Sequence, residues 1–273
     1  MLGDLATATR PLQAAACEVV FNRPAGGRYR HLALAATPAA LAVQPGQFFQ
    51  LLCPGQGEGS HMLRRPMSVY RIDRAARRVE FLYKVRGAGT SGLARLLPGG
   101  RLDIFGPLGR GFRLDAAWRH IVLLARGAGL ATLTPLAEAA GAQGMEVTAI
   151  LSVERPDLAM PAEHLRAAGA EVTIVSDADG SSAPERVDDL LRQLALARGS
   201  AMLATCGSKR LLQIVQRIGR ELGVTTQVAL EEHMACGLGM CFCCARPFNV
   251  GGKVEVRRIC HDGPVFDAQE VLL

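Results

Sequence analysis

Eight cysteines occur in the sequence, and five of them lie within the 25 residues that end at Cys260. Four follow the spacing Cys236-x4-Cys241-x2-Cys244-x15-Cys260. This is the ligand spacing of plant-type [2Fe–2S] clusters, in which four thiolates hold two sulfide-bridged irons. A tight loop can supply three of the thiolates, and a later segment supplies the fourth. The sequence therefore predicts a [2Fe–2S] cluster held by Cys236, Cys241, Cys244 and Cys260.

A structural zinc site is the alternative reading of the same cysteines. Zinc ribbons favour two paired C-x2-C knuckles or Cys/His pairs, and this spacing does not make two knuckles. Cys243 is the spare cysteine, because adjacent residues cannot easily both bind one compact cluster. Gly237 and Gly239 fit a loop whose backbone wraps closely and directs N–H groups at cluster sulfurs.

A second group of residues has the types that bind a flavin nucleotide. Arg65 begins the run Arg65-Pro66-Met67-Ser68 and supplies a fixed positive charge for a pyrophosphate. Ser68 offers a small donor to a ring nitrogen, and the Gly89-Thr90 turn opens a helical stretch and presents N–H groups to an anion. The run Leu82-Tyr83-Lys84 lies between these segments. The residue types alone also fit an ordinary strand start.

A third group lies where a dinucleotide would meet a parallel sheet. Gly127 and Gly129 follow an apolar strand and open a helix, which is where a phosphate meets a helix N-terminus. Cys206-Gly207 follows a later strand, at the sheet edge where ligands of α/β proteins bind. Cys206 alone is equally well read as a small buried apolar residue. Glu154 favours NAD and Arg155 favours NADP at the adenosine ribose, unless both are solvated loop charges.

The elements that position the flavin group are short strands in the first part of the chain. Six brief runs are separated by turn signals such as Pro45-Gly46 and Pro98-Gly-Gly100, a pattern typical of a small antiparallel barrel. The glycine-rich segment Gly106–Phe112 reads as a linker or hinge. The expected strands are Glu18–Phe21, His31–Ala35, Gln47–Leu52, Met67–Ile72, Val79–Val85 and Leu102–Phe105, and a helix is expected at Ser91–Leu97.

After this linker, strands alternate with helices, which predicts an open parallel α/β sheet. The expected strands are His120–Ala125, Glu146–Leu151, Glu171–Val175, Ala201–Thr205 and Gln227–Leu230, and the expected helices are Ala131–Ala142, Val187–Ala197 and Lys209–Leu222. The final segment has little helical periodicity. We therefore expect an α+β multidomain chain: a β-barrel flavin domain (1–110), an α/β dinucleotide domain (111–226) and an iron–sulfur module (227–273).

Composition excludes several other classes of protein. Apolar residues make up 49% and charged residues 21% of the chain, which supports packed cores rather than disorder. The net charge of +6 is scattered, so we expect no nucleic-acid partner. No apolar run is long enough to span a membrane, and the start of the chain, with Asp4, lacks a signal pattern. The chain is expected to be cytoplasmic, where clustered cysteines indicate metal or redox chemistry.

Taken together, these motifs resemble those of the electron-transfer subunits of class B dihydroorotate dehydrogenases, a branch of the ferredoxin–NADP reductase superfamily. The resemblance covers essentially the whole chain, and the run from Glu231 to Cys244, with Cys260-His261-Asp262-Gly263-Pro264, carries it most strongly. It implies that FAD is held by Arg65, Pro66, Met67, Ser68, Leu82, Tyr83, Lys84, Gly89 and Thr90. It also implies that Gly127, Gly129, Cys206 and Gly207 face NAD(H).

The resemblance further implies a relay of electrons between NAD(H) and a catalytic oxidoreductase subunit, expected to be a flavoprotein in a hetero-oligomer, through FAD and the cluster. Three alternatives remain open at this point. One is a reductase that feeds an oxygenase or a soluble acceptor, and another is a diaphorase subunit of a larger complex. The third, of a different class, is a zinc-stabilised binding protein on a degenerate reductase scaffold.

Overall fold

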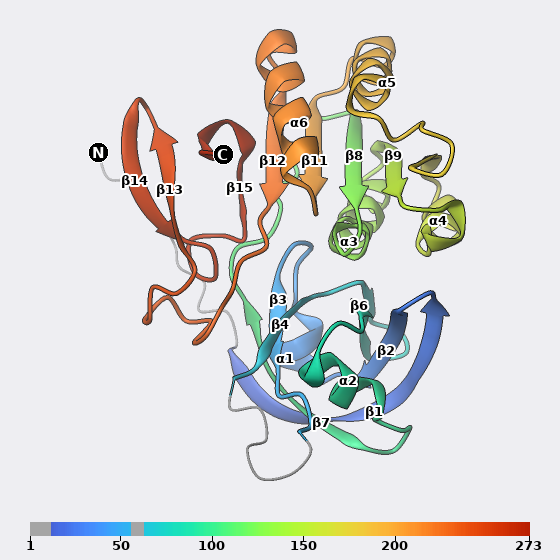
Figure 1. Ribbon diagram of the computed structural model, residues 1–273, viewed down its shortest axis with the longest axis vertical. Coiled ribbons are helices and arrows are strands. Elements are labelled where there is room, and N and C mark those ends of the chain that lie inside the picture. Colours follow the sequence, from blue (N-terminus) through green and yellow to red (C-terminus); the bar gives the residue numbers. More distant parts are fainter. Residues whose placement is uncertain (1–11, 56–62) are drawn as a thin grey trace.

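The computed structural model describes residues 12–55 and 63–273, so the start of the chain on which the absence of a signal was argued lies outside them. The first part is a seven-stranded antiparallel sheet in the order β4-β3-β7-β1-β2-β6-β5. It curves into the barrel drawn at the bottom of Figure 1. Its strands are β1 (Gln13–Gly26), β2 (Tyr29–Ala35), β3 (Phe48–Leu51), β4 (Arg65–Ser68), β5 (Arg71–Asp73), β6 (Arg78–Lys84) and β7 (Arg101–Leu108), with short helices α1 (Pro38–Leu41) and α2 (Ala88–Ala94).

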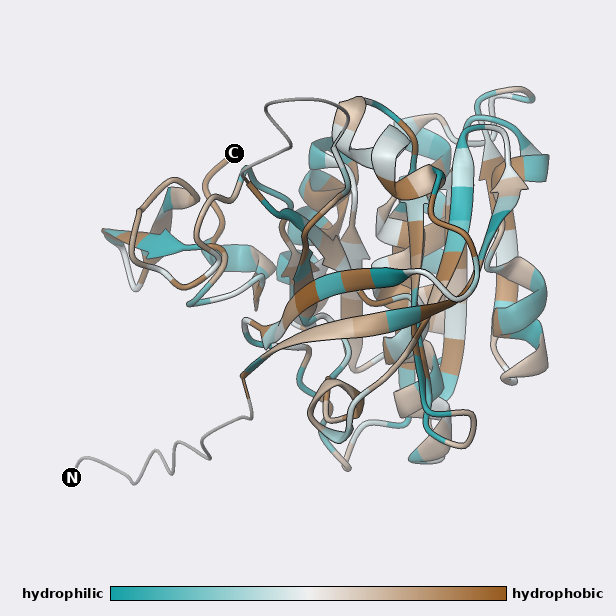
Figure 2. Cartoon of the chain, turned by 90° about the horizontal axis from the view of Figure 1, so that it is seen from below, coloured by the Kyte–Doolittle hydropathy of each residue, from teal (hydrophilic) through white to brown (hydrophobic). Residues whose placement is uncertain are grey.

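Alternation along the strands gives the barrel its core. On β3, Phe49 and Leu51 pack into the barrel interior, whereas Phe48 packs outside it against the later part of the chain. The barrel strands that lie in front in Figure 2 change between hydrophobic and hydrophilic along their length for the same reason. The predicted antiparallel barrel is confirmed.

Two local predictions for the barrel were wrong. The expected strand Met67–Ile72 is two strands, β4 and β5, in different parts of the sheet. The segment Gly106–Phe112 is not a free linker, because its first three residues continue β7. A Cβ at Gly106 would lie 2.5 Å from the Phe49 ring, so this glycine lets the strand pass close over the barrel core.

The second sheet has the order β10-β9-β8-β11-β12-β15 and is parallel except for its last strand. The parallel strands are β8 (His120–Arg126), β9 (Glu146–Val153), β10 (Glu171–Ser176), β11 (Met202–Cys206) and β12 (Thr225–Ala229). Helices α3 (Gly129–Ala142) and α4 (Ala162–Ala167) pack on one face, and α5 (Pro184–Ala197) and α6 (Lys209–Leu222) on the other. A 3-10 turn, η1, covers Pro156–Leu158. The predicted α/β sheet is confirmed.

Helix α6 shows why some elements could be predicted closely. Ser208 caps its start by accepting a hydrogen bond from the backbone N–H of Leu211, and Gly223 ends it in a left-handed conformation (φ +66°). Its apolar side chains, including Ile214 and Ile218, face the sheet. These signals are all local, and the observed bounds equal the predicted ones.

The last segment leaves the α/β sheet and returns to it. After β12 the chain passes through the cysteines, forms the hairpin of β13 (Ala245–Val250) and β14 (Lys253–Arg258), and comes back as β15 (Val265–Asp267) beside β12. The 3-10 turn η2 (Ala268–Glu270) follows. Figure 1 shows the hairpin standing to one side of both the sheet and the barrel, and Figure 2 shows the same from below.

The carboxyl ends of the parallel strands point toward the barrel in Figure 1. Ligands of open α/β sheets bind at that edge, so the fold places the predicted dinucleotide residues opposite the predicted flavin residues. Within the part of the chain that the structure describes, no helix is long and apolar enough to cross a membrane.

Candidate functional site

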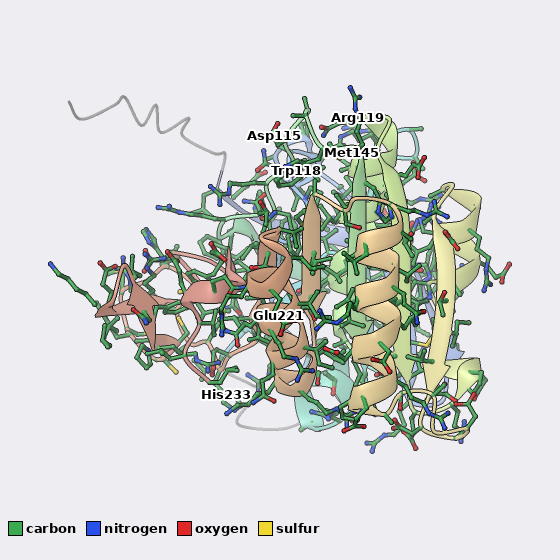
Figure 3. All side chains as sticks on the ribbon, turned by 90° about the horizontal axis from the view of Figure 1, so that it is seen from above. Asp115, Trp118, Arg119, Met145, Glu221 and His233 are labelled. Carbon is green, nitrogen blue, oxygen red and sulfur yellow. The ribbon has the colours of Figure 1, made fainter. Side chains whose placement is uncertain are left out.

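A cavity of about 640 Å³ lies between the barrel and the carboxyl edge of the α/β sheet. Its volume falls within the range of about 300–1,000 Å³ that is usual for cofactor and ligand sites. Figure 3 shows the orientation: the labelled His233 follows β12 at this edge, whereas Trp118 and Arg119 precede β8 at the opposite edge. Seven of the nine residues expected to hold a flavin line this cavity: Pro66, Met67, Ser68, Leu82, Tyr83, Lys84 and Thr90.

The other two expected flavin residues, Arg65 and Gly89, lie next to each other outside that lining. A Cβ at Gly89 would be 3.3 Å from Nε of Arg65. The two arginines of this strand start are used differently. Arg64 donates to both carboxylate oxygens of Asp103, at 3.1 and 3.0 Å, whereas the Arg65 guanidinium donates only to carbonyls of its own strand start, nearest at 3.0 Å to Leu63. Among the described residues, Arg65 thus forms no ion pair, and its charge lies beside the α2 turn.

The hydroxyl of Thr90 organises that turn. It accepts hydrogen bonds from the backbone N–H groups of Arg86 (2.9 Å) and Gly87 (3.2 Å) and donates to the Gly87 carbonyl (3.1 Å). All of its bonding capacity is thus directed at the loop. Thr90 therefore holds the shape of the turn whose N–H groups are expected to face an anion.

On the α/β side, the predicted residues form one tight junction between two elements. Gly127 and Gly207 line the cavity, and Gly129 and Cys206 lie just behind it. A Cβ at Gly129 would be 2.3 Å from the Cys206 carbonyl oxygen, and one at Gly207 would be 2.0 Å from the Arg126 carbonyl oxygen. Only glycine lets α3 begin this close to the end of β11.

The thiol of Cys206 is buried against this junction. Burial, and then the charge of Glu231, raise the pKa of Cys206, so its sulfur stays protonated. The residue is 1% exposed and does not line the cavity. In the loop that follows β9, Arg155 forms an ion pair with the exposed Asp157, at 2.9 Å, rather than with Glu154.

Several cavity residues were not predicted from the sequence. They come from segments far apart in the chain and include Tyr29, Phe48, Arg86, Arg126, Glu231 and Met234. Glu231 is open to the cavity, whose walls raise the pKa of its carboxyl by desolvation while Arg86 partly offsets the rise. Glu231 follows the end of β12 directly after Leu230, so the carboxyl edge of the sheet brings it to the cavity.

The four predicted cluster cysteines lie together as two pairs. Cys236 and Cys241 interact through their side chains, and Cys244 and Cys260 form the second pair, with the Cys260 backbone N–H donating to Sγ of Cys244 at 3.4 Å. Cys244 and Cys260 are buried in the core between the α/β sheet and the hairpin, whereas Cys241 is exposed. Two pairs of thiols suit two irons, because each iron of a [2Fe–2S] unit takes two thiolates.

Backbone N–H groups surround the first pair. The N–H of Leu238 donates to Sγ of Cys236 at 3.3 Å. Burial raises the pKa of Cys236. The Leu238 N–H and the other backbone donors of the loop outweigh burial and lower the pKa overall, so the thiolate is favoured. Gly237 (φ +71°) and Gly239 (φ +77°) let the loop turn these donors inward.

The structure also bears on the alternative ligand set. Within residues 12–55 and 63–273, no three His, Cys, Asp or Glu side chains converge as the ligands of one metal ion would. The spare Cys243 points to the His233 carbonyl, at 3.6 Å, and not into either pair. A further observation favours an occupant beside the loop: the carboxamide of Gln50, 1% exposed, faces Gly237, and neither of its polar atoms has a hydrogen-bond partner within residues 12–55 and 63–273. These residues fit a cluster that accepts hydrogen bonds through sulfur.

Comparison with known proteins places the chain among redox proteins. Residues 231–272 match the family described as the iron-sulfur cluster binding domain of dihydroorotate dehydrogenase B. The dihydroorotate dehydrogenase B (NAD(+)) electron transfer subunit of Geobacillus sp. (strain WCH70) is 33% identical over 259 residues, covering 93% of this chain and 97% of that protein. The same subunit of Geobacillus thermodenitrificans (strain NG80-2) is 34% identical over 257 residues, with the same coverage of both chains.

Solved structures share the fold. The structure of an NADH-dependent reduced ferredoxin-NADP oxidoreductase has a TM-score of 0.78 at 23% identity and covers 94% of this chain and 89% of its own. The ferredoxin-NADP+ reductase of Plasmodium falciparum has a TM-score of 0.60 at 15% identity, covering 79% and 96%. At these identities the likeness shows the fold alone.

Proposed function

Because this chain belongs to the family of dihydroorotate dehydrogenase B electron transfer subunits, we propose that it relays electrons between NAD(H) and a catalytic partner subunit. When bound, FAD exchanges a hydride with NAD(H), and the [2Fe–2S] cluster carries electrons singly to the partner. The observation that carries this proposal is the pairing of the four cysteines inside the segment that matches the family's cluster-binding domain.

The barrel side of the cavity holds and orients the flavin in this proposal. Pro66, Met67 and Ser68 from β4 and Leu82, Tyr83 and Lys84 from β6 form adjoining walls at which a ring system is positioned. Arg65 supplies its positive charge, together with the Gly89-Thr90 turn, to the phosphates.

The α/β side of the cavity receives the dinucleotide. Gly127 and Gly207 expose backbone at the carboxyl edge of β8 and β11, and Gly129 lets the two elements meet without a side chain between them. The neutral Cys206 thiol lies behind Gly207, so it adds no charge at the junction. We take NAD as the nucleotide, in line with the relatives' names.

When bound, the cluster would be held by the first pair, Cys236 and Cys241, together with the second pair, Cys244 and Cys260. In the first pair Cys241 is exposed and Cys236 is half-buried, and Met240 and Phe242 in the same loop are 78% and 57% exposed. The relatives are subunits of a larger enzyme, and we therefore place the catalytic partner, an oxidoreductase that we expect to be a flavoprotein, in a hetero-oligomer with this chain.

Cytoplasmic location is part of the proposal. All eight cysteines lie in described residues and none of them forms a disulfide, as expected in a reducing compartment. The product of such a complex serves pyrimidine biosynthesis, because dihydroorotate dehydrogenation is a step of that process.

Anaerobic purification of the full chain tests the proposal. We expect a coloured protein with one FAD, two irons and two sulfides per chain, whose flavin is bleached by NADH and whose cluster then gives an electron paramagnetic resonance signal. Co-purification with the native host's dihydroorotate-oxidising subunit is expected as well. A colourless protein that contains zinc and no flavin would refute the proposal and favour the binding-protein alternative.

A further inference from the structure

Gln50 occupies the layer between the flavin cavity and the cysteine loop. It lies on β3 opposite Pro66 of β4, so its side chain shares a sheet face with Phe48, Pro66 and Ser68, all of which line the cavity. Gln50 itself does not line the cavity, because the cysteine loop covers it. A Cβ at Gly237 would lie 3.0 Å from Nε2 of Gln50 and 3.1 Å from its Cγ.

The carboxamide of Gln50 is buried where the barrel meets the cysteine loop. The residue is 1% exposed, and neither Nε2 nor Oε1 has a partner among the described residues. Such a group costs free energy unless something satisfies it, and most buried amides are satisfied. Gln47, three residues earlier and equally buried, donates to the Gly109 carbonyl and accepts from the Gln44 N–H, each at 2.8 Å.

The neighbours of this carboxamide indicate what satisfies it. The apolar Leu108 side chain borders the same position beside Gly237, 3.2 Å from where a Cβ would lie, and offers no acceptor. The residue before Gly237 is Cys236, whose sulfur already accepts a hydrogen bond from the Leu238 N–H. Sulfur atoms of a bound cluster are the hydrogen-bond acceptors that belong in this place.

We propose that Gln50 is a positioning and tuning residue of the cluster, whose Nε2 donates a hydrogen bond to a sulfur on the Cys236 side of the [2Fe–2S] unit. This inference rests on the proposed function. Reduction adds one negative charge to the cluster, and an N–H donor stabilises the reduced form more than the oxidised form. Gln50 therefore raises the cluster's midpoint potential and favours its acceptance of an electron arriving from the barrel side.

The test compares midpoint potentials of the full chain, purified anaerobically and titrated while the cluster signal is followed by electron paramagnetic resonance and the flavin by absorbance. Gln50→Leu keeps the side chain's size and removes the donor. We expect the equilibrium constant for cluster reduction to fall about tenfold. This corresponds to a midpoint potential that is lower by about 59 mV for a one-electron couple. Gln50→Glu, which replaces the donor with a carboxylate, should shift the cluster potential in the same direction. The flavin potential should stay unchanged in Gln50→Leu, which introduces no charge.

Gln216→Leu is the matched control. Gln216 is also a buried amide, but its Nε2 is fully used by the carbonyls of Ala268 (2.7 Å) and Val271 (2.9 Å). We expect this control to lower the unfolding temperature and leave the cluster potential unchanged, and Gln50→Leu to leave the unfolding temperature of the cluster-free chain unchanged or raise it.

The outcomes separate the two proposals. A cluster potential in Gln50→Leu and Gln50→Glu that equals the wild-type value would overturn the role of Gln50, as would a shift in the flavin potential alone. A wild-type protein that contains no cluster would overturn the proposed function itself.

Discussion

At the scale of single residues, the adjacent Cys243 and Cys244 differ in their burial and in the groups that their sulfur atoms contact. Cys244 is buried beside Cys260, and Cys243 is exposed and turned to the His233 carbonyl. We expect Cys243→Ser to keep its full iron content and visible spectrum. Cys244→Ser should lose most of both, because one iron would keep a single thiolate. Iron and sulfide analysis measures this; equal loss in the two variants would contradict the assignment.

Glu80 is a second residue with a testable contribution, here to stability. Its buried carboxylate bonds to His31 at 2.7 Å and lies 3.6 Å from Arg71, which in turn lies 3.9 Å from Glu138 on α3. Burial raises the pKa of Glu80, but His31 and Arg71 outweigh it and lower the pKa below the ordinary 4.5. We expect Glu80→Gln to lower the free energy of unfolding at pH 7 by about 2 kcal/mol.

The difference between wild type and Glu80→Gln should depend on pH. A carboxyl whose pKa is lowered by folding contributes its stability above its unfolded-state pKa and loses it as the pH falls through the folded-state value. The difference in the free energy of unfolding, measured with urea, should therefore be largest at pH 7 and disappear under acid conditions. There the Glu80 carboxylate becomes protonated and neutral, whereas the amide that replaces it does not titrate. A difference that is constant down to acid pH would contradict this account.

The residues that could be predicted are those whose function depends on local spacing. The cysteine pattern is such a case, because three ligands lie in one loop. Gln50 could not be predicted, because it faces the loop around Gly237, which is distant in the chain, and nothing local marks it. Glu231 was missed although it follows β12 at the sheet edge that borders the cavity, because one acidic residue after a strand is not distinctive.

At the scale of elements, the junction of α3 with β11 depends on one glycine. Gly129→Ala would place a Cβ 2.3 Å from a backbone carbonyl that cannot move aside, so we expect a loss of about 1–3 kcal/mol in the free energy of unfolding. Gly141→Ala on the same helix is the control, with its nearest atom at an ordinary 3.5 Å. It should stabilise the chain by about 0.5–1 kcal/mol, since alanine favours helix. Urea unfolding of both variants measures this, and equal effects would refute the close-packing argument.

Elements with complete local signals were predicted well, and those made by pairing across the chain were not. Helix α6 has its cap, its apolar face and its terminal glycine in sequence. The hairpin β13–β14 has exposed Val254 and Val256 on a strand with four charged residues, so its apolar pattern gives no clear period. The short α1 and α4 were also missed, because four and six residues are too few for periodicity to appear.

At the scale of the whole molecule, the C-terminal segment completes the α/β sheet. Phe266 and Ala268 are buried in its core, and Gln216 of α6 is bonded to the carbonyls of Ala268 and Val271. We expect a chain that ends at residue 262 to unfold at a lower temperature than the full chain and to lose its cluster although all four cysteines remain. Circular dichroism melting and iron analysis measure this. Unchanged melting would show instead that residues 227–273 are an independent unit, as their predicted domain boundary implies.

Both ends of the cysteine segment leave from neighbouring strands, since β12 and β15 are paired side by side. A segment anchored in this way follows the sheet as one body. Any swing of the α/β sheet about the barrel would then alter the gap between the isoalloxazine site and the irons, while the gap between the irons and the nicotinamide site stayed fixed.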